Sequence, residues 1–206
     1  MSSRSKRVFF DDFVFVVDEN VYEPAEDSFL FAENLDVKED EWVLDMGTGC
    51  GILGILAAKK ASAVVVVDVN PYAVRCAKEN AELNNVRSKT AFVQGDLFTP
   101  LSEKAKFDVI FFNAPYLPTE NAESDSWLER AWKGGTTGRQ VIDRFISEAP
   151  QHLEQTGRIF IMQSTLANID ETILRLNDRG LSTSIVAEQA TPFFETITFL
   201  KAKHFV

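Results

Sequence analysis

The sequence predicts an α/β protein with one mostly parallel β-sheet, helices on both faces and an antiparallel hairpin at the carboxyl end. From Trp42 onward, short β-branched and apolar runs alternate with amphipathic segments, which is typical of a parallel sheet covered by helices. A glycine-rich turn joins the first of these runs to the first helical segment. Only residues 189–195 separate the last two runs, whereas a parallel crossover needs about a dozen residues or more, so these two strands are expected to pair antiparallel.

Seven strands and four helices follow from this alternation. The strands are expected at residues 42–46, 63–68, 90–94, 107–112, 157–163, 181–188 and 196–203. Apolar residues recur at helical spacing in the gaps, which predicts helices over residues 52–60, 72–83, 139–149 and 167–179. Pro71 suits a helix start, because the first turn has no use for the missing N–H.

The first 41 residues are interpreted as a short cap on the catalytic core. They contain an apolar run at residues 8–17 and a helix expected over residues 27–34, and we expect them to cover the sheet or a bound cofactor. Residues 42–206 would form the core, so that residues 1–206 make a single domain. With 45% hydrophobic residues the chain can bury one substantial core.

Charge and composition narrow the classes of function. A formal net charge of −10 disfavours nonspecific nucleic-acid binding, which depends on Lys and Arg neutralising phosphates. No apolar run approaches the roughly 20 residues of a membrane helix, and no secretory signal is visible, so a cytoplasmic protein without membrane contact is expected. Cys50 and Cys76 lack metal-ligand spacing; no metal is expected, and buried, inert thiols are favoured.

Acidic residues follow three successive strands. The turn at residues 45–51 (Asp-Met-Gly-Thr-Gly-Cys-Gly) lets a ligand approach the backbone closely, although a tight strand-to-helix turn would need the same glycines. Asp68 ends the second strand, where a carboxylate can accept hydrogen bonds from both ribose hydroxyls. Asp96 follows the third strand, where it would reach an adenine amino group. Each acid alone is typical of caps and turns, but their recurrence indicates a nucleoside site.

These motifs resemble those of the class I S-adenosylmethionine-dependent methyltransferases, over essentially the whole chain from Trp42. The resemblance implies a Rossmann-like methyltransferase sheet and S-adenosylmethionine as cofactor, with its methionine end at residues 45–51, its ribose at Asp68 and its adenine near Asp96. The cofactor-binding residues that it implies are Glu26, Ser28, Asp45, Gly47, Thr48, Gly49, Gly51, Asp68, Val69, Asp96, Leu97 and Asn113.

The tetrapeptide Asn113-Ala114-Pro115-Tyr116 follows the apolar run at residues 109–112 and resembles the Asn-Pro-Pro-Tyr motif of methyltransferases that modify amide or amino nitrogens. Asn113 Oδ1 and the Ala114 carbonyl would each accept one substrate N–H. Pro115 restricts Ala114 to extended geometry, and Tyr116 offers a face for a planar group. Alanine departs from the motif at the second position, which contributes a main-chain atom.

Residues 23–28 and 134–139 resemble segments of the HemK2/Mtq2 branch of protein glutamine N5-methyltransferases. This branch modifies the Gly-Gly-Gln glutamine of class I translation termination factors. The short N-terminal region agrees, because bacterial HemK/PrmC enzymes carry a helical substrate domain ahead of the core. The resemblance also implies a small zinc-binding Trm112-type activator on the sheet edge expected near Ala91–Gln94.

Two other functions stay open at this point. One is a nucleic-acid methyltransferase acting on adenine N6 or guanine N2, because such enzymes share the acceptor motif. The other is a methyltransferase-like scaffold without turnover. For the glycine segment at residues 134–138, a substrate lid and a flexible loop are equally favoured.

Overall fold

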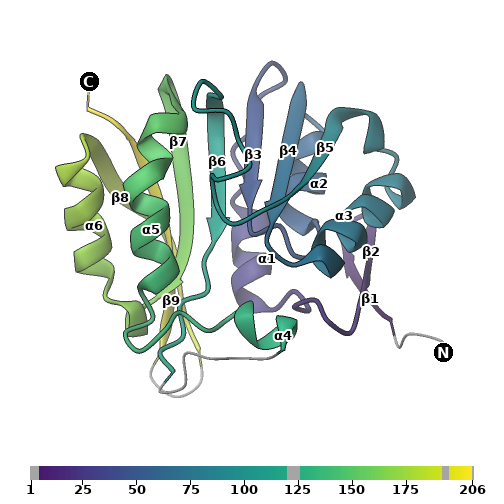
Figure 1. Ribbon diagram of the computed structural model, residues 1–206, viewed down its shortest axis with the longest axis horizontal. Coiled ribbons are helices and arrows are strands. Elements are labelled where there is room, and N and C mark those ends of the chain that lie inside the picture. Colours follow the sequence, from purple (N-terminus) through teal and green to yellow (C-terminus); the bar gives the residue numbers. More distant parts are fainter. Residues whose placement is uncertain (1–4, 120–125, 192–194, 206) are drawn as a thin grey trace.

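The computed structural model describes residues 5–119, 126–191 and 195–205. Its main feature is a seven-stranded sheet with the order β5-β4-β3-β6-β7-β9-β8, beside a separate two-stranded hairpin (Figure 1). The strands are β1 (Lys6–Phe10), β2 (Phe13–Val17), β3 (Trp42–Met46), β4 (Ala63–Asp68), β5 (Thr90–Gln94), β6 (Phe107–Asn113), β7 (Leu153–Ser164), β8 (Leu181–Ala190) and β9 (Thr196–His204). The helices are α1 (Glu26–Glu33), α2 (Ile52–Ala58), α3 (Pro71–Leu83), α4 (Trp127–Arg130), α5 (Gln140–Glu148) and α6 (Ile169–Asp178), with short 3-10 turns at Arg87–Lys89, Ala149–His152 and Thr165–Ala167.

The predicted sheet is confirmed. Strands β3 to β7 pair in parallel, and β9 pairs antiparallel with both β7 and β8. Strand β5 lies at one edge of the sheet, as expected, and β8 at the other. The main difference in bounds is β7, which begins at Leu153 rather than near residue 157, with a register shift against β6 between Phe107 and Val109.

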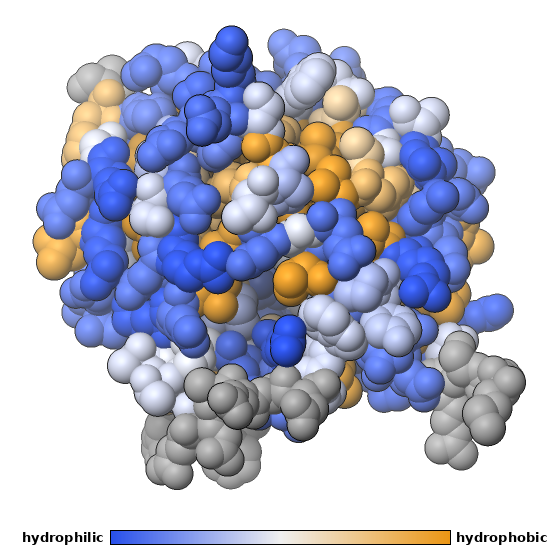
Figure 2. Space-filling model, in the orientation of Figure 1, coloured by the Kyte–Doolittle hydropathy of each residue, from blue (hydrophilic) through white to orange (hydrophobic). Residues whose placement is uncertain are grey.

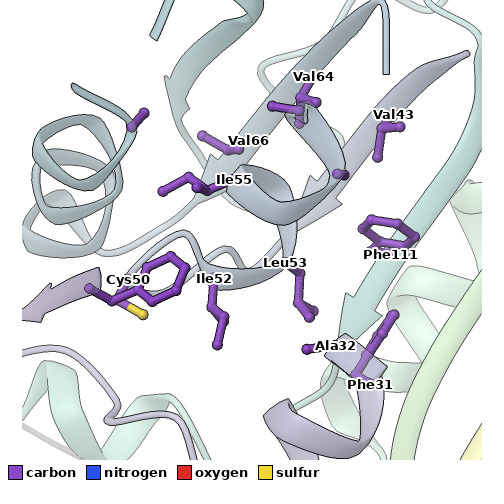
Figure 3. Close-up of a cluster of buried hydrophobic side chains, with 14 of the residues drawn as sticks. Phe31, Ala32, Val43, Cys50, Ile52, Leu53, Ile55, Val64, Val66 and Phe111 are labelled. Atoms are coloured by element: carbon purple, nitrogen blue, oxygen red, sulfur yellow. The ribbon is translucent and has the colours of Figure 1, made fainter. Parts of the chain in front are cut away.

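Both faces of the central strands of the sheet are buried. Along β3, Val43 packs with the cluster under α1, α2 and α3, and its neighbour Leu44 packs with the cluster under α5 and α6. Figure 3 shows Ile55 of α2 pointing toward Val66. Such full burial of one large apolar side chain contributes about 1.5–3 kcal/mol, so this two-faced core rigidly positions the strand ends.

The N-terminal hairpin packs against α3. Asp11 turns the chain with a φ of 47°. The side chains of Asn80 and Asn84 then pair with the outer backbone edge of β2: Asn80 Oδ1 accepts from Val16 N at 2.8 Å, and Asn84 Oδ1 accepts from Val14 N at 3.1 Å. These side-chain amides make the backbone hydrogen bonds that a neighbouring strand would otherwise make. The segment after the hairpin, residues 21–28, reaches the carboxyl end of the parallel strands.

The surface over α5 and α6 is mostly hydrophilic, whereas hydrophobic side chains gather over the middle of the sheet between α5 and α3 (Figure 2). Among the described residues, no helix combines the length and apolar character needed to cross a membrane.

Candidate active site

A cavity of about 570 Å³ lies at the carboxyl ends of β3, β4 and β6. Ligand pockets in proteins commonly measure roughly 300–1,000 Å³. The chain runs outward from β3 to β4 and β5 and then returns to β6, so the strand order reverses between β3 and β6. Such a reversal leaves a crevice outside the strand ends, which is where open α/β sheets bind ligands.

The glycine turn after β3 forms one wall of this cavity. Gly47 N and Thr48 N both donate to the carbonyl of Val67, at 2.8 and 3.1 Å, which ties the turn to β4. Gly49 has a φ of +56°, and a Cβ placed there would meet no atom within 4 Å. Its backbone therefore borders open space, and a ligand can approach it without a side chain in between.

Asp45 lies under the turn and does not line the cavity. It is 1% exposed, and its Oδ2 accepts hydrogen bonds from Thr48 Oγ1 at 2.6 Å and from Gly54 N at 2.9 Å. Burial raises its pKa from 3.8 to about 6. Asp45 thus joins the turn to helix α2 and can act on a ligand only through Thr48 and the backbone.

We expect Asp45→Asn to change the pH dependence of stability. Because the folded-state pKa is raised, the contribution of Asp45 is greatest below the unfolded pKa of 3.8 and is lost as the pH rises to about 6. Asparagine keeps an acceptor for Thr48 and Gly54 and carries no charge. The unfolding free energy of the variant, relative to wild type, should rise by about 1 kcal/mol between pH 5 and pH 7. Urea titrations check this; the exposed change Asp178→Asn should give a flat difference.

Asp68 and Asp96 both line the cavity but differ in their partners. Asp68 ends β4, and its two oxygens accept from Gly49 N and Asn70 N, each at 2.9 Å. A carboxylate has about four acceptor positions, so two remain for a ligand. Asp96 is about half exposed and pairs with Arg144 Nη2 at 2.7 Å. It has less capacity left for a ligand.

Asn113 ends β6, between β3 and β7, and lines the cavity. Its Nδ2 donates to Asp27 Oδ2 at 3.1 Å and to Ser28 Oγ at 3.3 Å, both at the start of α1. Its Oδ1 is buried and has no hydrogen-bond partner among the described residues. An unpaired buried acceptor costs about 1–3 kcal/mol, so this oxygen is suited to a donor brought by a ligand.

Tyr116, the last residue of the tetrapeptide, shares a hydrogen-bond partner with Asn113. Its hydroxyl donates to Asp27 Oδ2 at 3.4 Å, and Tyr22 OH donates to Asp27 Oδ1 at 3.2 Å. Burial, followed by the nearby charge of Asp27, raises the pKa of both phenols above their ordinary range. The two tyrosines therefore stay protonated at neutral pH and act as donors and packing faces rather than as bases.

The glycine segment at residues 134–138 forms hydrogen bonds with residues 117 and 119, in the loop that follows β6. Gly134 N donates to Leu117 O, and Thr119 N donates to Gly135 O, both at 2.9 Å. Gly138 has a φ of +73°, and a Cβ on it would lie 2.3 Å from the Tyr116 carbonyl oxygen. The segment is therefore hydrogen-bonded to Leu117 and Thr119 of the loop that follows β6.

Replacing Gly138 with alanine is expected to lower turnover at least tenfold, because its Cβ would displace the Tyr116 carbonyl and misplace the reacting groups. Binding of a ligand beside the glycine turn after β3 should change little. Gly180→Ala is the matched control: Gly180 also has a positive φ, of +80°, but a Cβ there would meet no atom within 4 Å. Steady-state kinetics of both variants separate the collision from the shared backbone strain, and equal losses would contradict this explanation.

The structure gathers most of the predicted site residues around one cavity. The predicted residues that line it are Ser28, Gly47, Thr48, Gly49, Asp68, Val69, Asp96, Leu97, Asn113, Ala114, Pro115 and Tyr116. Glu26, Asp45 and Gly51 are not among its described lining residues, since Glu26 is exposed on α1 and the other two support the turn. Residues that the motifs missed also line it: Tyr22, Asp27, Trp127, Arg130, Trp132 and Lys133.

Both cysteines are buried and free, as expected. Cys76 Sγ donates to the Val16 carbonyl at 3.0 Å, and burial raises the pKa of its thiol to about 11. Burial also raises the pKa of Cys50 beyond its ordinary range. Both side chains therefore remain thiols at neutral pH.

Comparison with known proteins gives one consistent family. Residues 23–190 match the family model described as the methyltransferase small domain. The chain is 49% identical over 178 residues to a protein of Methanocaldococcus jannaschii provisionally named a protein N5-glutamine methyltransferase, covering 85% of this chain and 88% of the relative. It is 33% identical over 195 residues to the human methyltransferase HEMK2, covering 88% and 89%. Among solved structures, the Mtq2–Trm112 complex of E. cuniculi, described as methylating the termination factor eRF1, superposes with a TM-score of 0.69 at 26% identity, over 90% of this chain and 99% of the other.

Proposed function

The chain belongs to the methyltransferase small domain family, beside relatives named as protein N5-glutamine methyltransferases, and on this premise we propose the reaction that it catalyses. It transfers a methyl group from S-adenosylmethionine to the side-chain nitrogen of the glutamine in the Gly-Gly-Gln motif of a class I translation termination factor. A cytoplasmic location is part of this proposal, because termination factors work on ribosomes.

The observation that carries the proposal is the unpaired acceptor of Asn113. Its Oδ1 is buried without a partner among the described residues, on the wall of a cavity that also holds the glycine turn and Asp68. A primary amide brings two N–H donors. One would satisfy Asn113 Oδ1, and the other would reach the carbonyl of Ala114.

The residues present fit S-adenosylmethionine. Open space at Gly49 admits a ligand against the backbone, and Asp68 keeps acceptor capacity for two ribose hydroxyls. When bound, this cofactor supplies a methyl group on a positively charged sulfur, which keeps the bonding electron pair when the methyl leaves. Val21, Tyr22, Pro24, Asp27 and Ser28 line the same cavity as the core, which supports treating residues 1–41 as part of one domain.

The chain would act mainly by positioning. An amide nitrogen is a weak nucleophile, because its lone pair is delocalised into the carbonyl group. Hydrogen bonds from its two N–H groups to Asn113 and Ala114 would raise the electron density on nitrogen and hold it in line with the methyl carbon. Well-oriented reactants can gain roughly 7–11 kcal/mol from effective concentration alone. The proton displaced from nitrogen leaves to water, so no side chain of the site needs to act as a base.

A labelling experiment tests the reaction. The protein is incubated with S-adenosylmethionine carrying a labelled methyl group, with and without a Trm112-type activator, and with either a termination factor or total nucleic acid. Label is expected in the termination factor and absent when the glutamine of its Gly-Gly-Gln motif is replaced by alanine. Label found only in nucleic acid would overturn the proposal and favour the amino-methyltransferase alternative.

A small zinc-binding activator of the Trm112 type is proposed to pair with β5. Strand β5 is an edge of the sheet, and its Ala91 is exposed while Phe92 lies half-buried under Arg87, 4.8 Å from the guanidinium. A sheet edge with apolar side chains is prone to association unless a partner covers it. The solved Mtq2–Trm112 assembly supports a partner of this kind.

Placing a lysine on this edge is expected to block the partner. Ala91→Lys should reduce co-purification with the activator at least tenfold, because a charge on an edge strand opposes strand pairing. Ser184→Lys makes the same change at an exposed position of the opposite edge strand and should leave co-purification intact. Full activity of the protein expressed without any activator would count against the partner.

A further inference from the structure

We propose that Asp27 is a positioning residue that fixes the side-chain amide of Asn113 with its oxygen toward the substrate. The inference rests on the proposed function and deepens it, since it assigns a role to a side chain outside the acceptor tetrapeptide. It also defines the acceptor as a group that must carry N–H donors, such as a primary amide.

The carboxylate of Asp27 accepts hydrogen bonds from several residues of the site. It is 6% exposed. Its Oδ2 accepts from Asn113 Nδ2 and from Tyr116 OH, at 3.1 and 3.4 Å, which are the first and last residues of the tetrapeptide. Its Oδ1 accepts from Ser28 N at 2.6 Å and from Tyr22 OH at 3.2 Å. One buried carboxylate therefore joins α1 to both ends of the acceptor motif.

Asp27 decides which way the Asn113 amide faces. An ionised carboxylate only accepts hydrogen bonds, whereas an amide has a donating nitrogen and an accepting oxygen. Asn113 must therefore turn Nδ2 toward Asp27, which leaves Oδ1 for the substrate. The other partner of Nδ2, Ser28 Oγ, follows the same choice, because its hydroxyl donates to Asp27 Oδ1 at 3.2 Å and therefore accepts from Asn113 Nδ2.

The charge of Asp27 would also assist the reaction itself. Donation from Nδ2 to a carboxylate increases electron density on Oδ1 of the same amide, and successive hydrogen bonds strengthen one another in a buried site. Positive charge develops on the substrate nitrogen as the methyl group is transferred. The negative charge of Asp27, on the far side of the Asn113 amide, stabilises the transition state more than it stabilises the bound substrate. The effect should therefore appear in kcat rather than in KM.

Asp27→Asn tests this role, because it keeps the shape of the side chain and lets position 27 either accept from Nδ2 or donate to Oδ1 of the Asn113 amide. We expect kcat to fall by roughly 10- to 100-fold, less than for removal of a group that contacts the reacting atoms. KM for the termination factor and the affinity for S-adenosylmethionine should stay within about threefold. Asp178→Asn, the same substitution at an exposed position of α6, should change none of them.

A double-mutant cycle distinguishes positioning from a general structural role. If Asp27 acts through Asn113, Asp27→Asn should cost nothing further in an Asn113→Ala background. Equal losses of kcat in both backgrounds would overturn the inference while leaving the proposed function in place. If Asp27→Asn does not fold, Asp27→Ser takes its place in the cycle.

A second readout needs no activity. The side-chain amide signals of Asn113 in a ¹⁵N-labelled sample, identified by their loss in Asn113→Ala, should shift and exchange faster with water in Asp27→Asn. Unchanged signals would overturn the inference whether or not the wild-type protein methylates a termination factor. Failure of the wild-type protein to label any termination factor would instead refute the proposed function alone.

Discussion

Replacing Asn113 with alanine is expected to lower kcat by about 10²–10³-fold, the range seen when one hydrogen-bonding group that stabilises a transition state is removed. The variant loses the buried Oδ1, which has no partner among the described residues, together with the donor that reaches Asp27 at 3.1 Å. The substrate nitrogen then keeps one acceptor, on Ala114, and can rotate away from the methyl carbon.

Cofactor affinity separates this explanation from its rivals. Calorimetric titration with S-adenosylmethionine should give a dissociation constant within about threefold of wild type, because Asp68 and the glycine turn remain. Asn177→Ala, at an exposed position of α6, is the matched control and should leave both quantities unchanged. Equal losses of kcat and cofactor affinity would place Asn113 in the cofactor site instead of the acceptor site.

Local sequence patterns predicted the sheet and many of the residues that line the cavity, for a physical reason. A parallel sheet buried on both faces needs continuous apolar strands, and most of the parallel strands here are followed by a turn and a helix. The positions of strands β3 to β9 along the chain can therefore be recognised from the pattern of apolar runs. The site residues that follow strand ends, such as Asp68 and Asn113, were predicted for the same reason, because the fold brings carboxyl ends together.

The acidic residues near the site show where local patterns fail. Glu26 and Asp27 are neighbours at the start of α1, and either carboxylate could stabilise the helix terminus there. Only the contacts of Asp27 with Asn113 and Tyr116, more than 80 positions away along the chain, give it a site role, and a single sequence carries no sign of them. Similarly, Asp45 lies near the end of a strand as Asp68 does, but the hydrogen bonds that it accepts from Thr48 and Gly54 hold it under the loop.

The N-terminal hairpin and the two tryptophans that line the cavity, Trp127 and Trp132, were missed for different reasons. Two acidic residues, Asp11 and Asp12, interrupt the apolar run at residues 8–17, and this was the signal for a turn between β1 and β2. The short helix α4 has only four residues, too few for any periodicity, yet it brings Trp127 to the cavity. Such a segment is placed by its contacts with the loop that precedes it, where Leu117 N donates to Trp132 O at 2.9 Å.

Replacing Asp68 with alanine is expected to weaken S-adenosylmethionine binding by at least about 100-fold. The proposed pair of ribose hydroxyls would lose two hydrogen bonds to a charged acceptor, each contributing about 1.5–3 kcal/mol. The variant also releases Gly49 N and Asn70 N, both of which donate to this carboxylate at 2.9 Å. Calorimetric titration measures the affinity, and thermal unfolding of the variant without ligand shows whether the turn itself is lost.

Asp96→Ala provides the comparison that makes this prediction specific. Asp96 also follows a strand and lines the cavity, but it is about half exposed and already pairs with Arg144 at 2.7 Å. Its removal should weaken cofactor binding by no more than about tenfold, because an exposed hydrogen bond contributes about 1 kcal/mol or less. A larger loss for Asp96→Ala than for Asp68→Ala would mean that the ribose does not lie at Asp68.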